Sequence, residues 1–225
     1  SRARYRGAVK ILATTNAPFE FEAPEGVQVV RIDEAELVPA ENLDADAAIV
    51  QGWTSPAVTQ LAKEATRLQW VQTLAAGPDG VLAAGFPASV TITNGRGLHN
   101  LTVAETALTL ALTGIKQVPE MLDAQRETRW EHDEFGAWRT LRPNGRLGSL
   151  IDTNVLVWGF GAIGQQIAHN FTAMHAHVKG VANTAGERAG FEVFTDADLP
   201  TLLPQTDILV MVLPSADDTR QALSA

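Results

Sequence analysis

Residues 155–168 read VLVWGFGAIGQQIA, an apolar run followed by three glycines and the beginning of a segment with helical periodicity. The spacing G-x-G-x-x-G between a strand pattern and a helix pattern is typical of a turn that binds a dinucleotide. Gly159 would allow the tight turn, Gly161 would let the backbone approach a pyrophosphate, and Gly164 would let helix and strand pack closely. The alternative is a glycine-rich strand-to-helix turn that binds nothing.

The segments around this turn favour the nucleotide-binding interpretation. A helical pattern occupies 162–174, and its first N–H groups, at Ala162 and Ile163, would face the phosphate charge. Strand patterns follow at 177–182 and 207–214. Together these segments predict half of a Rossmann-type unit, in which the strands of a parallel sheet alternate with helices.

The end of the strand at 177–182 indicates which nucleotide is bound. A carboxylate at this position usually accepts hydrogen bonds from the ribose hydroxyls of NAD, but Asn183 and Thr184 supply no acid here. Arg188 lies a few residues further on and would pair with the 2′-phosphate of NADP. We therefore expect NADP or NAD as the cofactor and favour NADP. The alternative is that Glu187 or a water contacts the ribose and that Arg188 is a solvated charge.

The composition excludes several classes of protein. Of the 225 residues 45% are hydrophobic, which is enough for a globular protein of one or two domains. The net charge of −9 is spread along the chain, so we expect neither nucleic acid nor a membrane as a partner. The absence of cysteine excludes disulfides, thiolate nucleophiles and Cys-ligated metals. We predict no metal site and a cytoplasmic location.

The chain before the glycine turn alternates short strand patterns with helical ones. This alternation predicts a largely parallel α/β sheet, with binding residues on loops at the carboxyl ends of the strands. The clearest helix pattern is 55–67, where Ser55 is a candidate N-cap and Pro56 occupies the first helical position. The predicted strands are 8–15, 27–32, 47–52, 69–75 and 90–95.

A long helical pattern at 101–129 separates this part from the glycine turn. We interpret it as a helix that leads into a second domain. Gly114 and Pro119 are expected to bend or split this helix. Residues 130–150 have turn residues and no clean periodicity, so we predict an extended arm or loop there.

Several motifs, in the right order over most of the chain, resemble one family, the D-isomer-specific 2-hydroxyacid dehydrogenases. This is the group of phosphoglycerate, hydroxypyruvate and glyoxylate reductases. The segment 70–81 is similar to the family's substrate-domain loop, 94–108 to its crossing helix, and Trp130 to a tryptophan in its dimer arm. The segment 157–168 is similar to the nucleotide loop, and 206–223 to the segment that leads toward the active site.

The resemblance implies a fold of two α/β domains. Residues 1–98 would form a flavodoxin-like substrate domain, and 99–225 the first half of a doubly wound Rossmann-type nucleotide-binding domain. The backbone amides of Ala76 and Gly77 would hold the substrate carboxylate, because successive amides at a glycine turn form an anion nest. The alternative is a plain turn at the end of a strand. Pro78 departs from the common pattern and has no N–H to offer.

The resemblance also implies residues beside the nicotinamide ring. Thr102 and Val103 match residues that border it, and Leu213 and Pro214 match the strand end that lies along the cofactor. The alternative is that these four residues serve only the core and the end of a helix.

No catalytic residue is assigned within the chain. Reduction of a 2-keto acid needs a cation for the carboxylate, an acid for the carbonyl oxygen and a carboxylate that raises the pKa of this acid. In the family these are an Arg, a His and an acidic residue, which we expect beyond Ala225 in a longer protein. His99 is the one histidine considered near a cleft, but a role at the end of the long helix is favoured. Arg96 is a remote candidate.

The first hypothesis is therefore a cytoplasmic NADP- or NAD-dependent oxidoreductase that acts on small 2-hydroxy or 2-keto acids. By resemblance it would be a homodimer, with contacts from 101–129 and from the arm around Trp130. The alternative is a non-catalytic NAD(P)-binding protein that senses redox state or docks a partner. An S-adenosylmethionine methyltransferase is weaker, because it leaves the first 95 residues unexplained.

Overall fold

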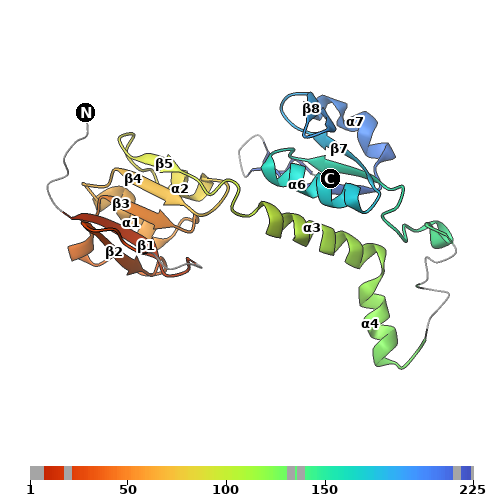
Figure 1. Cartoon of the computed structure of the whole chain (residues 1–225), viewed down its shortest axis with the longest axis horizontal. Helices are drawn as coiled ribbons and strands as arrows, with labels where there is room; N and C mark the ends of the chain where they lie inside the picture. Colours follow the sequence, from red (N-terminus) through yellow and green to blue (C-terminus); the bar gives the residue numbers. More distant parts are fainter. Residues whose placement is uncertain (1–7, 18–21, 131–134, 136–139, 215–218, 224–225) are drawn as a thin grey trace. The chain divides into compact units, whose positions relative to one another are not determined.

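The computed structural model describes residues 8–17, 22–130, 135, 140–214 and 219–223. The chain divides between Leu98 and His99 into two compact units. The second unit ends at Pro214, and the described residues 219–223 are grouped with the first (Figure 1). Among the described residues, no helix combines the length and the apolar character that a membrane span requires.

The first unit contains a five-stranded sheet with the order β2-β1-β3-β4-β5, and all its neighbouring strands are parallel. This order is that of flavodoxin-like folds, and it confirms the predicted parallel α/β architecture. Its strands are β1 (Val9–Thr14), β2 (Val27–Ile32), β3 (Ala47–Val50), β4 (Trp70–Thr73) and β5 (Thr91–Thr93). Its helices are η1 (Ala40–Asn42), α1 (Pro56–Glu64) and α2 (Asp79–Ala83).

Helix α1 begins where its sequence predicts. The hydroxyl of Ser55 accepts a hydrogen bond from the Val58 N–H at 3.2 Å, and Pro56 lies in the first turn, where it lacks only an N–H that has no partner in a helix. The helix buries Val58 and Leu61 against the sheet, together with Leu12 of β1 and the central strands. Burial of such side chains contributes about 1.5–3 kcal/mol each.

The second unit contains a sheet with the order β10-β6-β7-β9-β8. The pairs β10·β6, β6·β7 and β7·β9 are parallel, whereas β8·β9 is antiparallel. Its strands are β6 (Asn154–Trp158), β7 (His177–Val181), β8 (Gly186–Arg188), β9 (Phe191–Phe194) and β10 (Ile208–Met211). Its helices are α3 (Asn100–Ile115), α4 (Val118–Arg126), η2 (Pro143–Gly145), α6 (Ala162–Ala173), η3 (Asp196–Asp198), α7 (Leu199–Leu202) and η4 (Leu203–Gln205).

The long helical pattern is split, as predicted, but not at the glycine. Gly114 lies inside α3 without interrupting it, so the expectation for this residue is wrong. The break is at Gln117, which has a left-handed φ of 52°, and Pro119 lies in the first turn of α4. Gly114 is exposed and lies near the end of α3, so the low helix propensity of glycine is tolerated there.

The sequence analysis missed the hairpin of β8 and β9. Its two-residue turn, Ala189 and Gly190, has φ values of 52° and 82°. Positive φ at both central residues is the type I′ geometry, which matches the twist of the flanking strands. A glycine at the second turn position was the available signal. The pattern was missed because the three-residue strand β8 is too short to show alternation.

The core of the second unit lies between the sheet and the helices α3 and α6, which run side by side (Figure 1). Ile167 and Phe171 of α6 are fully buried there, together with Ala104 of α3. Phe160, from the glycine turn itself, also belongs to this core.

The predicted arm at 130–150 lies partly outside the described residues. Where it is described, Trp130 is 90% exposed, and Pro143–Gly145 form a single short helical turn, η2. Arg142 anchors this segment to the sheet, because its guanidinium donates to Asp207 at 2.8 Å.

Candidate functional site

The glycine turn leaves the carboxyl end of β6, between its neighbours β7 and β10. The N–H of Gly159 donates to the carbonyl of Val181 in β7 at 2.9 Å. On the other side, the N–H of Val212 donates to the carbonyl of Trp158 at 2.8 Å. The start of the turn is therefore fixed by both neighbouring strands, at the edge where parallel sheets bind ligands.

Two of the glycines are required by the packing of the turn on itself. Gly159 has a φ of +106°, and a Cβ added to it would lie 2.4 Å from the carbonyl oxygen of Val212. A Cβ on Gly164, in the first turn of α6, would lie 2.2 Å from the carbonyl oxygen of Gly159. Both contacts are with backbone, so any larger residue would force the strand and helix apart. The sequence did not single out Val212.

The middle glycine differs, because open space lies beside it. Gly161 is the N-cap of α6, with an extended backbone, and a Cβ built on it would meet no described heavy atom within 4 Å. No described side chain caps the helix, so the first N–H groups, which include those of Ala162 and Ile163, are left to a ligand or water. A helix N-terminus of this kind attracts phosphate, and the residues fit a pyrophosphate.

The residue before the turn is held by a segment that the sequence analysis did not consider. The indole N–H of Trp158 donates to a carboxylate oxygen of Asp196 at 2.8 Å. Asp196 belongs to the segment 195–198, which forms a capping box. The backbone N–H and the hydroxyl of Thr195 both donate to a carboxylate oxygen of Asp198. These two hydrogen bonds, the backbone one first, hold the pKa of Asp198 below its usual value. The signal in the sequence was the pattern T-D-A-D, which places an acid three residues after a threonine.

The structure brings together two of the residues predicted to choose the nucleotide. Asn183 and Thr184 follow β7 and are exposed, and Arg188 is the last residue of β8. The guanidinium of Arg188 donates to the carbonyl of Thr184 at 2.9 Å and also to its hydroxyl. The guanidinium of Arg188 is therefore held beside a residue that follows β7.

The other residues predicted to border the cofactor lie on two different parts of the second unit, after β10 and at the start of α3. Leu213 and Pro214 come after β10 rather than inside it. The backbone N of Leu213 lies 3.1 Å from a Cβ built on Gly159, which puts this residue at the glycine turn. Thr102 and Val103 lie in the first turn of α3 and are exposed, and the Thr102 hydroxyl donates to the carbonyl of His99 at 3.3 Å.

The predicted carboxylate turn belongs to the first unit. Ala76 and Gly77 lie between β4 and α2 and are half-buried. A carboxylate oxygen of Asp79 lies 2.7 Å from a Cβ built on Gly77. Because two carboxylates repel each other, a substrate carboxylate must approach these amides away from Asp79. Arg96, on the loop after β5, is exposed.

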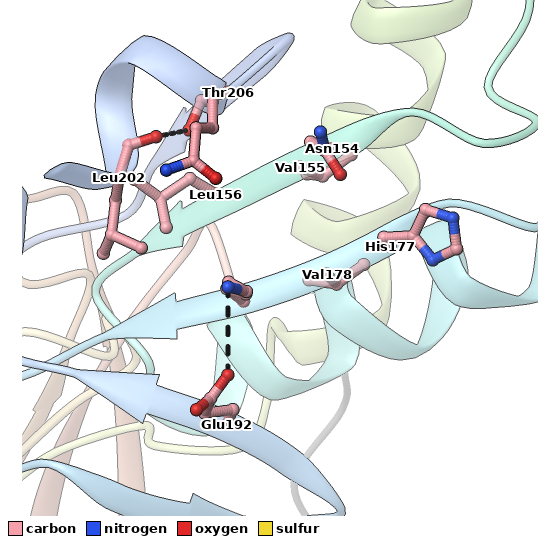
Figure 2. A pocket seen from close by; sticks show the side chains of 10 residues that line it. Asn154, Val155, Leu156, His177, Val178, Glu192, Leu202 and Thr206 are labelled. Carbon is pink, nitrogen blue, oxygen red and sulfur yellow. Dashed lines mark hydrogen bonds and ion pairs between the residues drawn. The ribbon is translucent and has the colours of Figure 1, made fainter.

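One described cavity of about 170 Å³ lies at the opposite end of the second sheet (Figure 2). Its lining includes Asn154 and His177, the first residues of β6 and β7, so it is not at the glycine turn. Nearby, burial alone would raise the pKa of Asp207, but hydrogen bonds from the Asn154 N–H and from Arg142 hold it below its usual value. We interpret this region as scaffold.

Among the described residues, no group of three or more His, Cys, Asp or Glu side chains is arranged to hold a metal ion.

Comparisons with known proteins identify the family. A sequence model described as D-isomer specific 2-hydroxyacid dehydrogenase, NAD binding domain, matches residues 108–225, which is just over half of the chain. A D-3-phosphoglycerate dehydrogenase of Archaeoglobus fulgidus is 21% identical over 165 residues, which cover 71% of this chain and 29% of that protein.

Solved structures show the same fold. An NADPH-dependent glyoxylate/hydroxypyruvate reductase from Sinorhizobium meliloti, in complex with NADP and sulfate, has a TM-score of 0.74 and 24% identity, covering 94% of this chain and 64% of that one. A second reductase so described from the same organism, in complex with NADP and malonate, has a TM-score of 0.68 and 25% identity, covering 97% and 66%. The chain thus spans about two thirds of each of these structures.

The matched domain confirms the predicted cofactor class, NAD or NADP. It includes the glycine turn, α6 and the strands β6 to β10. On the extent of this match, the chain belongs to the D-isomer-specific 2-hydroxyacid dehydrogenase family.

Proposed function

We propose that the protein is an oxidoreductase that transfers a hydride between a nicotinamide dinucleotide and a small 2-hydroxy or 2-keto acid. The observation that carries this proposal is the glycine turn, in which Gly159 and Gly164 are closed against backbone while Gly161 faces open space at the start of α6. This is the shape that a pyrophosphate requires. The family of the matched domain supports the reaction class.

The second unit would bind the cofactor. In the second unit, Gly161 and the amides of Ala162 and Ile163 would hold the pyrophosphate, and Val103, Leu213 and Pro214 would border the nicotinamide. The bound dinucleotide would supply or accept the hydride. We assign the proton donor to no residue of this chain.

In the first unit, the amides of Ala76 and Gly77 would hold and orient the substrate carboxylate. Two solved structures with this fold are described as glyoxylate/hydroxypyruvate reductases. We therefore propose 2-keto acids as substrates.

The proposed cofactor preference is for NADP over NAD. The guanidinium of Arg188 already lies beside Thr184, at the end of β7, where the ribose of a dinucleotide binds in Rossmann-type units. Glu187 precedes Arg188 in β8, but successive side chains of a strand point to opposite faces, so Glu187 points away from the side that Arg188 occupies. A cation at this position, with the adjacent acid Glu187 on the other face of the strand, favours a 2′-phosphate.

We expect Arg188→Ala to weaken the binding of NADPH about 30-fold, because charge-assisted hydrogen bonds to a phosphate contribute about 2 kcal/mol. The affinity for NADH, which lacks this phosphate, should stay within about twofold. Both affinities are measured by fluorescence titration. Lys179→Ala is the matched control, because it removes the same charge from an exposed position of β7. Equal losses for NADPH and NADH would show that Arg188 does not contact the 2′-phosphate.

The proposed activity is tested in two steps with the full-length protein. Titration with NADPH and NADH, followed by tryptophan fluorescence, to which Trp158 next to the turn contributes, decides whether a dinucleotide binds. Oxidation of NADPH in the presence of glyoxylate, hydroxypyruvate or phenylpyruvate then decides whether the protein is an enzyme. Tight binding without turnover of any of these acids would instead support the non-catalytic sensor, and no binding would refute both.

We also propose that the protein is a cytoplasmic homodimer. Leu101 and Leu110 of α3 and Leu122 of α4 are large, apolar and exposed, as is Trp130 just beyond α4. Exposed apolar surface of this extent is typical of an interface. Sedimentation velocity should give twice the monomer mass, and a monomer at micromolar concentration would refute this proposal.

A further inference from the structure

The loop after β3, residues 51–54, presents a tryptophan to solvent on a fixed backbone. Trp53 is 71% exposed, the most of any described tryptophan in the first unit. Gly52 before it has a φ of +120°, and a Cβ built on Gly52 would lie 2.3 Å from the hydroxyl of Thr73. The loop therefore has little freedom to fold the indole back onto the protein.

A buried carboxylate holds the beginning of this loop. Glu34 is only 5% exposed, and one of its oxygens accepts a hydrogen bond from the Gln51 N–H at 2.7 Å. The side-chain amide of Gln51 donates in turn to the carbonyl of Asn16 at 3.1 Å. A buried carboxylate is tolerated only when it is hydrogen-bonded, so Glu34 and the loop backbone fix each other.

The same loop packs directly on the turn proposed to hold the substrate carboxylate. The carbonyl of Gln51 accepts a hydrogen bond from the Ala75 N–H at 2.9 Å, and the Thr54 hydroxyl donates to the carbonyl of Gly80 at 3.1 Å. A Cβ built on Gly80 would lie 3.0 Å from the carbonyl carbon of Trp53. The backbone of Trp53 therefore touches the segment that follows β4.

A second exposed apolar side chain lies on the other side of this turn. The N–H of Gly95, after β5, donates to the carbonyl of Ala75 at 2.8 Å. A Cβ built on Gly95 would lie 2.1 Å from the carbonyl oxygen of Leu74 and 2.9 Å from Cδ1 of Leu98. Leu98 is itself 61% exposed. Because β4 lies between β3 and β5, the turn after it has Trp53 on one side and Leu98 on the other.

We infer that Trp53, with Leu98, contacts the side chain of the substrate and makes the protein favour 2-keto acids with an aryl or branched alkyl group. This inference rests on the proposed function. The amides of Ala76 and Gly77 would hold the carboxylate, which every 2-keto acid has, so they cannot select among substrates. An exposed indole beside that anchor gains from being covered by an apolar group. Glyoxylate has no such group and would leave it in water.

The test measures the affinity of keto acids by calorimetry for the full-length protein saturated with NADP⁺, which has no hydride to give. Trp53→Ala should weaken phenylpyruvate about tenfold, because aromatic contacts of this kind contribute about that factor. It should leave glyoxylate within about twofold, since glyoxylate has no side chain to lose a contact. Trp53→Phe, which keeps an aromatic ring, should keep phenylpyruvate within about threefold.

Leu37→Ala is the control, because Leu37 is 66% exposed beside α1, away from the turn after β4. It should change neither affinity, and urea unfolding checks that every variant folds. Equal changes for phenylpyruvate and glyoxylate in Trp53→Ala, or no change for either, would overturn the inference. If neither acid binds to the unaltered protein, the proposed function itself fails, which is a different result.

Discussion

Replacing Gly161 by aspartate should weaken NADPH binding at least about 100-fold, or about 2.7 kcal/mol, without loss of stability. The open space beside Gly161 accepts a side chain, and its backbone conformation suits any residue. Aspartate is moreover a preferred N-cap, so the free energy of unfolding should rise by up to about 1 kcal/mol. The new carboxylate would take the amides that the pyrophosphate needs and would repel its charge.

Gly161→Asn separates charge from shape in this experiment. Asparagine has the same size and also caps helices, but it is neutral. We expect it to weaken NADPH about tenfold, clearly less than aspartate. Calorimetric titration measures the affinities, and urea unfolding measures the stabilities. An aspartate variant that binds NADPH within about threefold of the unaltered protein would show that the phosphates do not lie at this turn.

Replacing Gly164 by alanine should, in contrast to the Gly161 variants, lower stability: we expect a loss of about 3 kcal/mol in the free energy of unfolding of the second unit. The added methyl group would lie 2.2 Å from the carbonyl oxygen of Gly159, which is backbone and cannot rotate away. The helix or the strand must therefore shift. Hydrogen exchange of the β6 and β7 amides measures this loss, because it reports the second unit separately.

Gly114→Ala is the matched control for this variant. It makes the same chemical change in helix α3, where a Cβ would meet no described heavy atom within 4 Å. We expect a gain of about 0.5 kcal/mol, because alanine favours helix over glycine. If Gly164→Ala also stabilised the second unit, the close contact between α6 and the end of β6 would be refuted.

The elements that the sequence predicted well are those whose local signals agree with their burial. Helix α1 begins at its Ser-Pro cap, and β2 occupies its predicted range of 27–32. The glycine turn lies between strand and helix as expected, because Gly159 and Gly164 pack closely against backbone atoms and the G-x-G-x-x-G spacing reflects this packing. The parallel order of the first sheet followed from the alternation of strands and helices.

The features that the sequence did not predict depend on contacts between distant segments. The run VANTAGER alone does not show that Arg188 donates to Thr184, because the path of this segment is set by the pairing of β8 with β9 and of β9 with β7. Nothing in the sequence singles out Glu34, yet its side chain is buried and accepts a hydrogen bond from the Gln51 N–H at the start of the loop that carries Trp53. The sequence also does not show the left-handed conformation of Gln117, although the break itself lies between Gly114 and Pro119, the two residues expected to bend or split the helix.

The segment that joins β7 to β9, residues 182–190, has a further consequence. Within one contiguous stretch, 182–190, it carries Thr184 and Arg188, and it is closed by its own two-residue turn at the margin of the sheet. No described side chain of this stretch is fully buried. If this segment sets the proposed preference for NADP, substitutions within it would change that preference without repacking the interior of the second unit.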